Sequence, residues 1–492
     1  MKGKIIIDGN KNEVECTSYL IELDKLSELS IYDNVSLRNN LNKVSKTTTE
    51  YGSAIYGTKC KVKIYGGEIS NNIQEVYIDK NSKEAILPEN MENDYIFDVK
   101  GVGIYMVCSK LYMYGGIICY NEGKNNTDIY SNENSTNNTN SKLYALCQRC
   151  SGIAIFAQSY SKIYLYKGEI SNNYARNNAK SNLISPKGNT LTKLSAIDSC
   201  IYGSAIYFSD SKLEMFNDFI IQNNFSLLNT NINIEKNCKI SNYIYSAIKA
   251  GQIYTSSSLI KIHGGIIQNS NNIPDRNIII APEEEELQKR IDNSDFGGAI
   301  SFMRCKDIEI NNLKIEKSKS KYGGAIYLSS SSIKINNSEL SNNFAEGFGG
   351  AIFSSGADCE IELYNVKILN NSTQDGSGGG IYAYGSLLID GENSLISNNE
   401  AGTYGGGIML KNKGLIKNCT ICNNKAKLSG GGIYIDGNLL LEKAKIYLNS
   451  CNETGGGICN ANIMLYDKNK IDSMIYDNTA GKNINNLHPE IN

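Results

Sequence analysis

Residues Lys321 to Gly350 read KYGGAIYLSSSSIKINNSELSNNFAEGFGG, and altered copies of this stretch follow it to the end of the chain. Each copy contains a Gly-Gly-[Ala/Gly]-Ile segment, whose isoleucine marks the repeat. The intervals between successive markers are 26, 26, 29, 27, 25 and 25 residues. A period in this range is typical of stacked structural units rather than of a compact globule. The markers are Ile300, Ile326, Ile352, Ile381, Ile408, Ile433 and Ile458.

Within one unit, three short runs alternate between apolar and polar residues. They cover residues 326–328, 333–335 and the segment ending at Leu340, with Gly, Ser or Asn between them. Alternation of this kind indicates strands, and no stretch inside a unit has helical spacing. A leucine-rich repeat has a similar period but only one strand per unit followed by a helical arm. The pattern therefore predicts an all-β fold, a single-stranded parallel β-helix (solenoid) of about twelve turns.

Two further columns of residues favour stacked turns. Glycine lies two positions before each marker, although glycine inside a strand costs about 0.5–1 kcal/mol, so a corner with close backbone approach or positive φ is expected there. Asparagine lies nine or ten positions before the marker, where stacked amides can bond to each other along the axis. The alternative is that asparagine is simply abundant in this chain. The glycines are Gly324, Gly350, Gly379, Gly406, Gly431 and Gly456, and the asparagines are Asn343, Asn371, Asn399, Asn424 and Asn449.

The N-terminal half carries a looser form of the repeat. Its expected markers are Ile55, Ile104, Ile155, Ile206 and Ile248. The asparagine column continues as Asn72, Asn121, Asn173 and Asn224 and lapses at Ser270 and Lys317. The extra length between markers predicts five insertions at one corner, mostly mobile loops, with a short acidic helix over 282–292. The insertions cover about residues 74–98, 122–148, 174–199, 225–243 and 271–295.

One continuous domain with three parts is therefore expected. Residues 1–50 provide capping strands, because the terminal units of a solenoid are degenerate. Residues 51–295 form the turns that carry insertions, and residues 296–492 form the regular turns.

Aromatic residues follow two columns predicted to face outward. The first contains Tyr56, Tyr105, Phe156 and Tyr207, and the second contains Tyr65, Tyr114, Tyr166 and Phe216, followed by His263. Rows of aromatic faces are suited to stacking on sugar rings or to anchoring a protein partner. The alternative is that tyrosine, a good strand residue, stacks on itself and stiffens the rod.

The sequence favours neither catalysis nor a metal site. Glu214, Glu309 and Glu362 are expected to face outward, but on separate turns with lysines between them, which is typical of a solvated surface. Only two histidines occur, so a Ser/His/Asp or Cys/His set is not expected, nor is any cofactor. The Cys-x-x-Cys pairs at 147–150 and 419–422 lack a second ligand pair. Cys60 and Cys108 fall at equivalent corners of successive turns, close enough for a disulfide if the strands stack; buried or loop thiols are the favoured alternative for the cysteines.

Composition limits the classes of partner and compartment. A net charge of −2 gives no case for binding nucleic acid or an anionic membrane. No signal peptide, anchor or membrane span is visible in this chain. On sequence alone, a cytoplasmic location stays open.

The strings SNNFAEGFGGAIF, SNNEAGTYGGGIM, CNNKAKLSGGGIY and IYGGEISNN resemble the repeats of polymorphic outer membrane proteins and related bacterial surface proteins. The resemblance covers about residues 50–480. It implies a right-handed parallel β-helix of pectin-lyase-like architecture and an extracellular or cell-surface, adhesin-like protein. The chain departs from the family in two ways. The family repeat has a second tetrapeptide that contains phenylalanine, and that position is usually Ile or Leu here. No carboxy-terminal membrane barrel is visible in this chain.

Together these observations predict a non-enzymatic stalk that binds a glycan or a protein on a host or neighbouring cell. A polysaccharide lyase or glycoside hydrolase built on a β-helix is the alternative, and a passive spacer is a third possibility.

Overall fold

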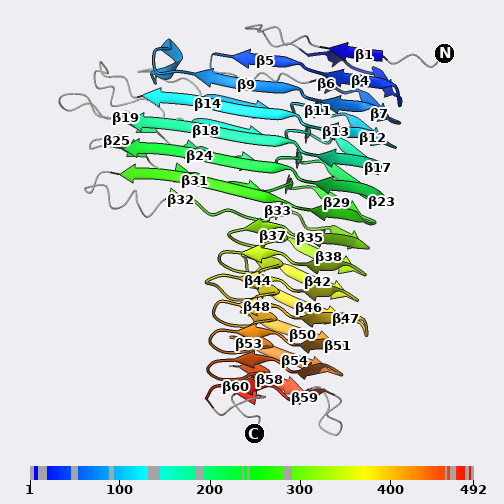
Figure 1. Cartoon of the computed structure of the whole chain (residues 1–492), viewed down its shortest axis with the longest axis vertical. Coiled ribbons are helices and arrows are strands. Elements are labelled where there is room, and N and C mark those ends of the chain that lie inside the picture. Colours follow the sequence, from blue (N-terminus) through cyan, green and yellow to red (C-terminus); the bar gives the residue numbers. More distant parts are fainter. Residues whose placement is uncertain are drawn as a thin grey trace.

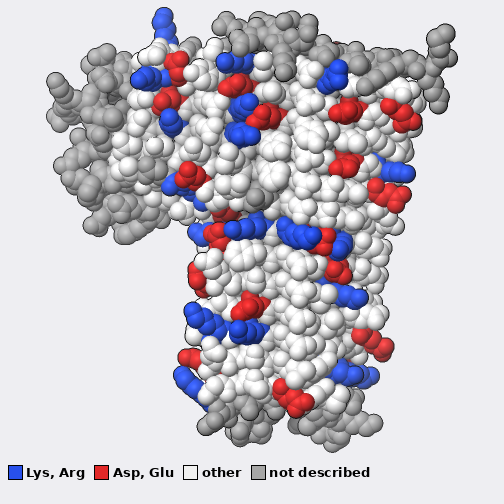
Figure 2. Space-filling model, viewed as in Figure 1, with Lys and Arg blue, Asp and Glu red and all other residues white. Residues whose placement is uncertain are grey.

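The computed structural model describes residues 5–8, 19–45, 54–87, 94–130, 145–183, 192–194, 196–234, 238–240, 244–280, 291–459, 462–465, 473–482 and 487–488. Its strands stack into an upright column that is much wider over the N-terminal half (Figure 1). On the face drawn in Figure 2, acidic and basic side chains lie interspersed. The only helical element in these ranges is the 3-10 turn η1 (Lys83–Ala85). Across the same ranges, no helix is long and apolar enough to cross a membrane.

A single turn of the regular half contains four strands. These are β37 (Ile326–Ser329), β38 (Ser332–Asn336), β39 (Glu339–Ser341) and β40 (Phe344–Ala345). Strand β37 pairs in parallel with β33 (Ile300–Met303) of the preceding turn and β41 (Ile352–Ser354) of the following one. Ile300, Ile326 and Ile352 occupy one row in this register. The predicted parallel β-helix is therefore confirmed.

Like strands of successive turns form long parallel sheets. The first strands build a 14-stranded sheet from β2 (Ile21–Leu23) to β61 (Leu487–His488). The second and third strands build a 25-stranded sheet. One first strand per turn gives fourteen turns, two more than the twelve expected. The two additional turns are the terminal ones, which lack the glycine-rich corner. Inward-facing isoleucines such as Ile326 and Ile352 are fully buried along the axis, and burying each contributes about 2 kcal/mol.

The described parts of the five insertions are strands that widen each turn, not the loops that the sequence suggested; residues 88–93, 131–144, 184–191 and 281–290 lie outside the described residues. Each leaves the corner on one strand and returns on another (Figure 1). The outgoing strands and β5 (Leu41–Val44) form a six-stranded parallel sheet. The outgoing strands are β9 (Ile73–Ile78), β14 (Glu122–Tyr130), β18 (Tyr174–Leu183), β24 (Phe225–Ile234) and β31 (Asn271–Ile280). The returning strands include β10 (Tyr95–Lys100), β15 (Leu146–Ser151), β20 (Ile197–Asp198), β21 (Ile201–Tyr202), β26 (Ile244–Tyr245) and β32 (Ile291–Asp292).

The outgoing and returning strands together form a lateral extension of the rod. The extension encloses a second core that is partly polar, which explains why the sequences of its strands resemble those of loops. Asn125 and Asn177 lie side by side on neighbouring strands and face inward. Asn177 donates to the Gln148 carbonyl at 2.8 Å, and the Gln148 side chain donates to Thr127 at 2.7 Å. Buried polar side chains are tolerated where they find such partners. The helix expected over 282–292 lies mostly outside the described residues, and its last two residues form β32.

The asparagine column forms a buried hydrogen-bonded ladder. The Asn343 backbone N–H and side-chain amide both donate to the side-chain oxygen of Asn371, at 2.9 and 3.0 Å. The same pattern runs on through Asn399, Asn424 and Asn449, and in the upper half through Asn72, Asn121, Asn173 and Asn224. The left-handed corner belongs to the preceding asparagine, for example Asn342 with φ 56°. Ser318, not Lys317, occupies the ladder position where the column lapses.

The glycine column also forms one row, because the backbones of adjacent turns approach closely there. A Cβ on Gly324 would collide with the carbonyl oxygen of Gly350, and one on Gly350 with that of Gly379. The same contact recurs at Gly379, Gly406 and Gly431. Close approach, rather than positive φ, therefore excludes side chains from this row.

One marker isoleucine predicted for the N-terminal half, Ile248, does not lie in the marker row. Ile248 pairs with Ile201 in the returning sheet of the extension. The residue in the marker row is Ile253, between Ile206 and Ile300. The segment YSAIKA imitates the corner sequence GSAIYF, and this similarity misplaced the marker by five residues.

Candidate functional site

The second aromatic column is a partly exposed strip on the outer face of the 25-stranded sheet. It follows β3 (Glu28–Ile31), β7 (Lys61–Ile64), β12 (Lys110–Met113), β17 (Lys162–Ser171), β23 (Lys212–Gln222) and β29 (Leu259–Ile262). Adjacent ring centroids are 5.1, 5.1, 4.9, 4.5 and 4.8 Å apart. We call this row the aromatic strip; it consists of Tyr32, Tyr65, Tyr114, Tyr166, Phe216 and His263.

The rings of the strip lie face to face along the axis. The planes of Tyr114 and Tyr166 differ by only 4°, and those of Tyr65 and Tyr114 by 13°. Tyr65 and Tyr114 nevertheless remain 40% and 39% exposed. Because each interior ring covers its neighbour's face, ring edges and phenol groups meet solvent. The sequence predicted one column for all of these residues except Tyr32, but ring orientation removes the open faces that sugar stacking would need.

Lysines line one side of the strip. Lys61, Lys110, Lys162 and Lys212 stand in register on four successive turns. Lys61 pairs with Glu28 at 2.7 Å, and the hydrogen bonds from Lys61 and Lys63 lower the pKa of Glu28 to about 2. Lys110 and Lys162 are exposed and have no ion pair among the described residues.

A second short row of rings lies between the lysines and the strip. Tyr112 and Tyr164 stack at 4.9 Å. The Lys212 ammonium lies 5.7 Å from the centroid of the Tyr164 ring. Burial and the neighbouring Tyr114 raise the pKa of Tyr166, so its phenol keeps its proton at neutral pH and can donate a hydrogen bond. This part of the sheet therefore presents phenol and ammonium groups, with the Glu214 carboxylate next to Tyr164 on the following turn.

The first aromatic column also stacks, but it is mostly covered. Ring centroids along Tyr56, Tyr105, Phe156 and Tyr207 are 5.4, 5.0 and 4.6 Å apart. Tyr254 extends the row at 5.3 Å from Tyr207; it was not predicted because it follows Ile253, and the marker had been placed at Ile248. Tyr105 is only 1% exposed and Phe156 2%. This column offers little surface to a ligand.

The covering comes from the returning strands of the extension, which meet the first-strand sheet at a sharp corner. The Lys100 ammonium lies 5.7 Å from the centroid of the Phe156 ring. Tyr202 packs its edge against Tyr207 and Tyr254, with centroids 6.3 and 5.0 Å away. Packing against the extension therefore fixes this column as an internal support.

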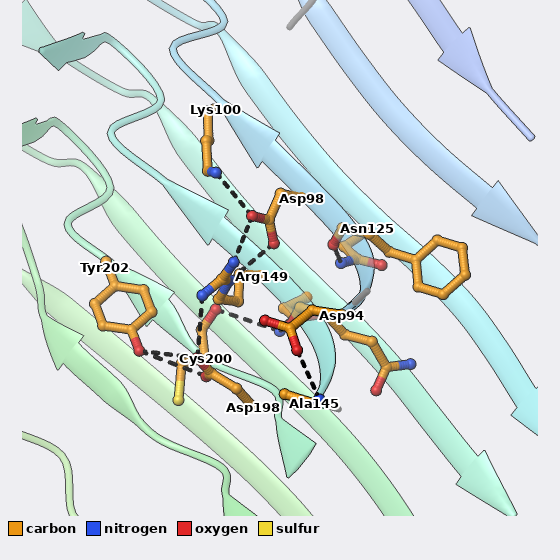
Figure 3. A network of polar contacts seen from close by, with 12 residues as sticks. Asp94, Asp98, Lys100, Asn125, Ala145, Arg149, Asp198, Cys200 and Tyr202 are labelled. Carbon is orange, nitrogen blue, oxygen red and sulfur yellow. Dashed lines mark hydrogen bonds and ion pairs between the residues drawn. The ribbon is translucent and has the colours of Figure 1, made fainter. Parts of the chain in front are cut away.

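An ion-pair network crosses the returning strands beside this corner (Figure 3). The Arg149 guanidinium donates to both carboxylate oxygens of Asp98, at 2.8 and 2.7 Å, and to a carboxylate oxygen of Asp198 at 3.4 Å. Lys100 pairs with Asp98 at 2.8 Å. Burial of Asp98 opposes its charge, but Lys100 and Arg149 outweigh this and lower the pKa of the carboxyl. The network joins three successive turns. Its residues belong to strands of the insertions, so their pairing could not be predicted from the sequence.

A shallow groove of about 640 Å³ lies below the strip on the same sheet. Four acids and three lysines line it, including Glu309, Lys334 and Glu362, which occupy one column on successive turns. The two glutamates are therefore about 9–10 Å apart at their backbones. Lys334 leans toward Tyr364, with its ammonium 4.9 Å from the ring centroid. Glu214 lies higher in the same column, beside Lys212.

The thiols of the described cysteines are mostly buried and unpaired. The disulfide that the sequence left open between Cys60 and Cys108 is not formed: Cys60 is buried and lies 3.5 Å from the Ser109 hydroxyl, whereas Cys108 is exposed at a left-handed corner with φ 52°. Ser109, not Cys108, is the residue in register with Cys60. Within the described ranges, no three His, Cys, Asp or Glu side chains gather as metal ligands would.

Residues 298–480 match the sequence model of a family described as "Right handed beta helix region". The chain is a right-handed parallel β-helix. The matched residues span the regular turns and stop short of the extension, the aromatic strip and the ion-pair network. No curated protein and no solved structure matches the chain. The resemblance to polymorphic outer membrane proteins stays a prediction.

Proposed function

We propose that this β-helix is a surface-exposed or secreted, adhesin-like scaffold that binds a glycan without catalysis. The observation that carries the proposal is the aromatic strip, an exposed row of rings held in register by six successive turns. The location rests on the resemblance of the repeats to bacterial surface proteins.

The orientation of the rings determines how the strip would recognise a glycan. Sugar rings stack on open aromatic faces, and the interior faces here are already occupied. What remains are the electropositive ring edges, the phenol hydroxyls and the adjacent ammonium groups of Lys110 and Lys162. These groups favour a glycan that carries acidic substituents and lies along the rod axis. Because the recognition is partly electrostatic, binding weakens as salt rises.

Glycan-array and solution binding by the whole chain test this proposal. Replacing Tyr114 and Tyr166 together by Phe keeps the stack but removes two hydroxyls, so we expect at least a tenfold loss of affinity. Replacing both by Ala is expected to abolish binding without loss of folding. The matched control is the distant stacked pair Tyr447 and Tyr476, with centroids 5.1 Å apart, replaced by Phe.

Three results contradict the proposal in distinct ways. Unchanged binding in the Tyr114/Tyr166 alanine variant removes the strip as the contact surface. Retention of a cell-surface protein with no glycan bound shows that the partner is a protein. Absence of any ligand leaves the passive spacer as the explanation.

Hydrolysis of a polysaccharide is the second candidate, favoured by the four acids in the groove below the strip. The separation of Glu309 and Glu362 is compatible with an acid and a base that act through a water molecule. Reducing-sugar release that is lost in Glu309→Gln and in Glu362→Gln supports this activity. No release from any polysaccharide that binds the chain rejects it.

A further inference from the structure

Four tyrosines form a block of nearly parallel rings on the outer face of the 25-stranded sheet. Tyr112 and Tyr114 belong to one turn, and Tyr164 and Tyr166 belong to the next. Across the turns, Tyr112 stacks on Tyr164 and Tyr114 stacks on Tyr166, with ring centroids 4.9 Å apart in both pairs. We call these four residues the tyrosine block. The block joins the aromatic strip to the short second row of rings.

The contacts along each strand differ from the contacts between turns. Alternate residues of a strand point to the same face of the sheet. Tyr112 and Tyr114 therefore stand side by side, with ring centroids 6.3 Å apart and ring planes within 6° of each other. Tyr164 and Tyr166 repeat this arrangement at 6.4 Å and 12°. Each ring of the block thus has one neighbour on the adjacent turn and another along its own strand.

The side-by-side pairs have the arrangement that a dityrosine bond requires. This bond joins the two ring carbons next to the hydroxyls, so the attachment points of the two side chains lie farther apart in the product than the ring centroids do. Alternate residues of a strand, about 6.6 Å apart, match that spread. Residues that face each other on neighbouring turns are only about 4.7–4.9 Å apart, which is too close. The geometry therefore favours a bond within a strand over a bond between turns.

We propose that the tyrosine block is a site of oxidative cross-linking, where a haem peroxidase with hydrogen peroxide bonds Tyr164 to Tyr166 and Tyr112 to Tyr114. In each pair, both phenols lose one hydrogen atom, an electron together with a proton, and become phenoxyl radicals. The radicals join through one carbon–carbon bond, and the hydrogen on each bonded carbon moves to the phenoxyl oxygen. One molecule of hydrogen peroxide accepts the two hydrogen atoms and leaves as two molecules of water.

The placement of the block supports reaction inside one chain. Tyr114 is 39% exposed and the other three rings are half-buried, so an oxidant in solution reaches the block from outside. Contact between stacked rings lets a radical on one ring take an electron from the next. Holding two reacting groups side by side converts a bimolecular step into a unimolecular one. The block therefore favours bonds within a chain over bonds between chains.

The cross-link changes the outer surface of the rod without tying its turns together. Both residues of a bonded pair belong to one strand, so the backbone pairing between turns stays as it is. The two linked phenols can no longer turn independently. Oxidation therefore alters how the aromatic strip presents its hydroxyls, and this inference does not depend on what the strip binds.

Peptide mapping of the whole chain after treatment with a haem peroxidase and hydrogen peroxide tests the proposal. Trypsin releases residues 163–167, which contain Tyr164 and Tyr166, as one short peptide. We expect this peptide to lose two hydrogen atoms, and its two tyrosines to stay joined on fragmentation. Tyr164→Phe keeps a stacked ring but removes a hydroxyl, so residues 163–167 of this variant should keep all their hydrogens. Residues 111–124, which contain the other pair, should still lose two.

The matched control is the partly exposed pair Tyr447 and Tyr476, whose rings stack on neighbouring turns with centroids 5.1 Å apart. We expect no bond between the two peptides that contain them, because residues on neighbouring turns are too close for the product. A bond between Tyr447 and Tyr476 in the same digest overturns the proposal. Residues 163–167 linked mainly to a second chain, or left unmodified under conditions that couple free tyrosine, overturn it as well.

Discussion

The side-chain amide of Asn399 donates to the side-chain oxygen of Asn424 at 2.9 Å, and the Asn399 backbone N–H donates to the same oxygen at 3.0 Å. One buried acceptor thus satisfies two donors from the preceding turn. Asn424 in turn donates to Asn449 and to the Ile396 carbonyl, both at 2.9 Å. The ladder fixes each turn's register on the next.

Replacing Asn424 by Ala should destabilise the fold by about 3 kcal/mol, because two buried donors of Asn399 lose their acceptor. Chemical denaturation of the whole chain measures the loss. Asn393→Ala, in an exposed turn of the same half, is the control and should change stability by less than about 0.5 kcal/mol. Equal effects of the two substitutions would show that the ladder is not a special source of stability.

Gly350→Ala should destabilise the fold by about 3 kcal/mol, because the added methyl would meet backbone atoms of Gly379 and Ser372 that cannot move independently. Gly356→Ala adds the same methyl where the nearest atoms belong to the Asp358 carboxylate. A flexible side chain can turn away, so this control should cost less than about 1 kcal/mol. Thermal unfolding of both variants compares them directly.

Arg149→Met should cost about 3 kcal/mol at pH 7, because it leaves the buried Asp98 carboxylate with Lys100 as its remaining partner. The folded-state pKa of Asp98 is below its ordinary value of 3.8, so the pair stabilises the fold above pH 4 and is lost as pH falls through the folded pKa. The difference between wild type and variant should therefore shrink below pH 4.

Lys425→Met is the comparison for that experiment. Its partner Glu400 lies 3.2 Å away, and both side chains are largely exposed. Exposed pairs contribute about 0–1 kcal/mol, so the loss should be small at every pH. A loss from Arg149→Met that is equally small would mean that the network contributes nothing to stability.

Alkylation of the native chain should label Cys108 well before Cys60. Cys108 is exposed, whereas burial raises the pKa of the Cys60 thiol and reduces its reactive thiolate. Peptide mapping by mass spectrometry after timed labelling measures both rates. A Cys60–Cys108 disulfide in non-reduced peptides would instead restore the pairing that the sequence suggested.

The regular turns could be predicted from the sequence alone because each residue type in them satisfies one physical constraint. Isoleucine fills the core, Gly350 and its equivalents fit where backbones touch, and Asn399 and its equivalents bond to one another. Such constraints act at fixed positions in every turn, so they appear as columns in the sequence.

The strands of the extension could not be predicted from the sequence, and the reason is also physical. Its inward positions include Asn125, Asn177 and Ser181, which hydrogen-bond to Phe97 and Gln148 of the returning strands instead of forming an apolar face. The alternation of polar and apolar residues is therefore missing. The aromatic columns were predicted, but which of them is covered depends on Lys100 and Tyr202 of the extension. Ring orientation has no signature in the sequence at all.

In the regular half, each turn bonds only to the turn above and the turn below, through hydrogen bonds that run parallel to the rod. A force that separates the two ends of the column therefore acts in full on every interface between turns, because the interfaces lie in series. The tension that the rod can bear is set by its weakest single interface and does not grow with the number of turns. Added length extends the reach of such a rod without strengthening it.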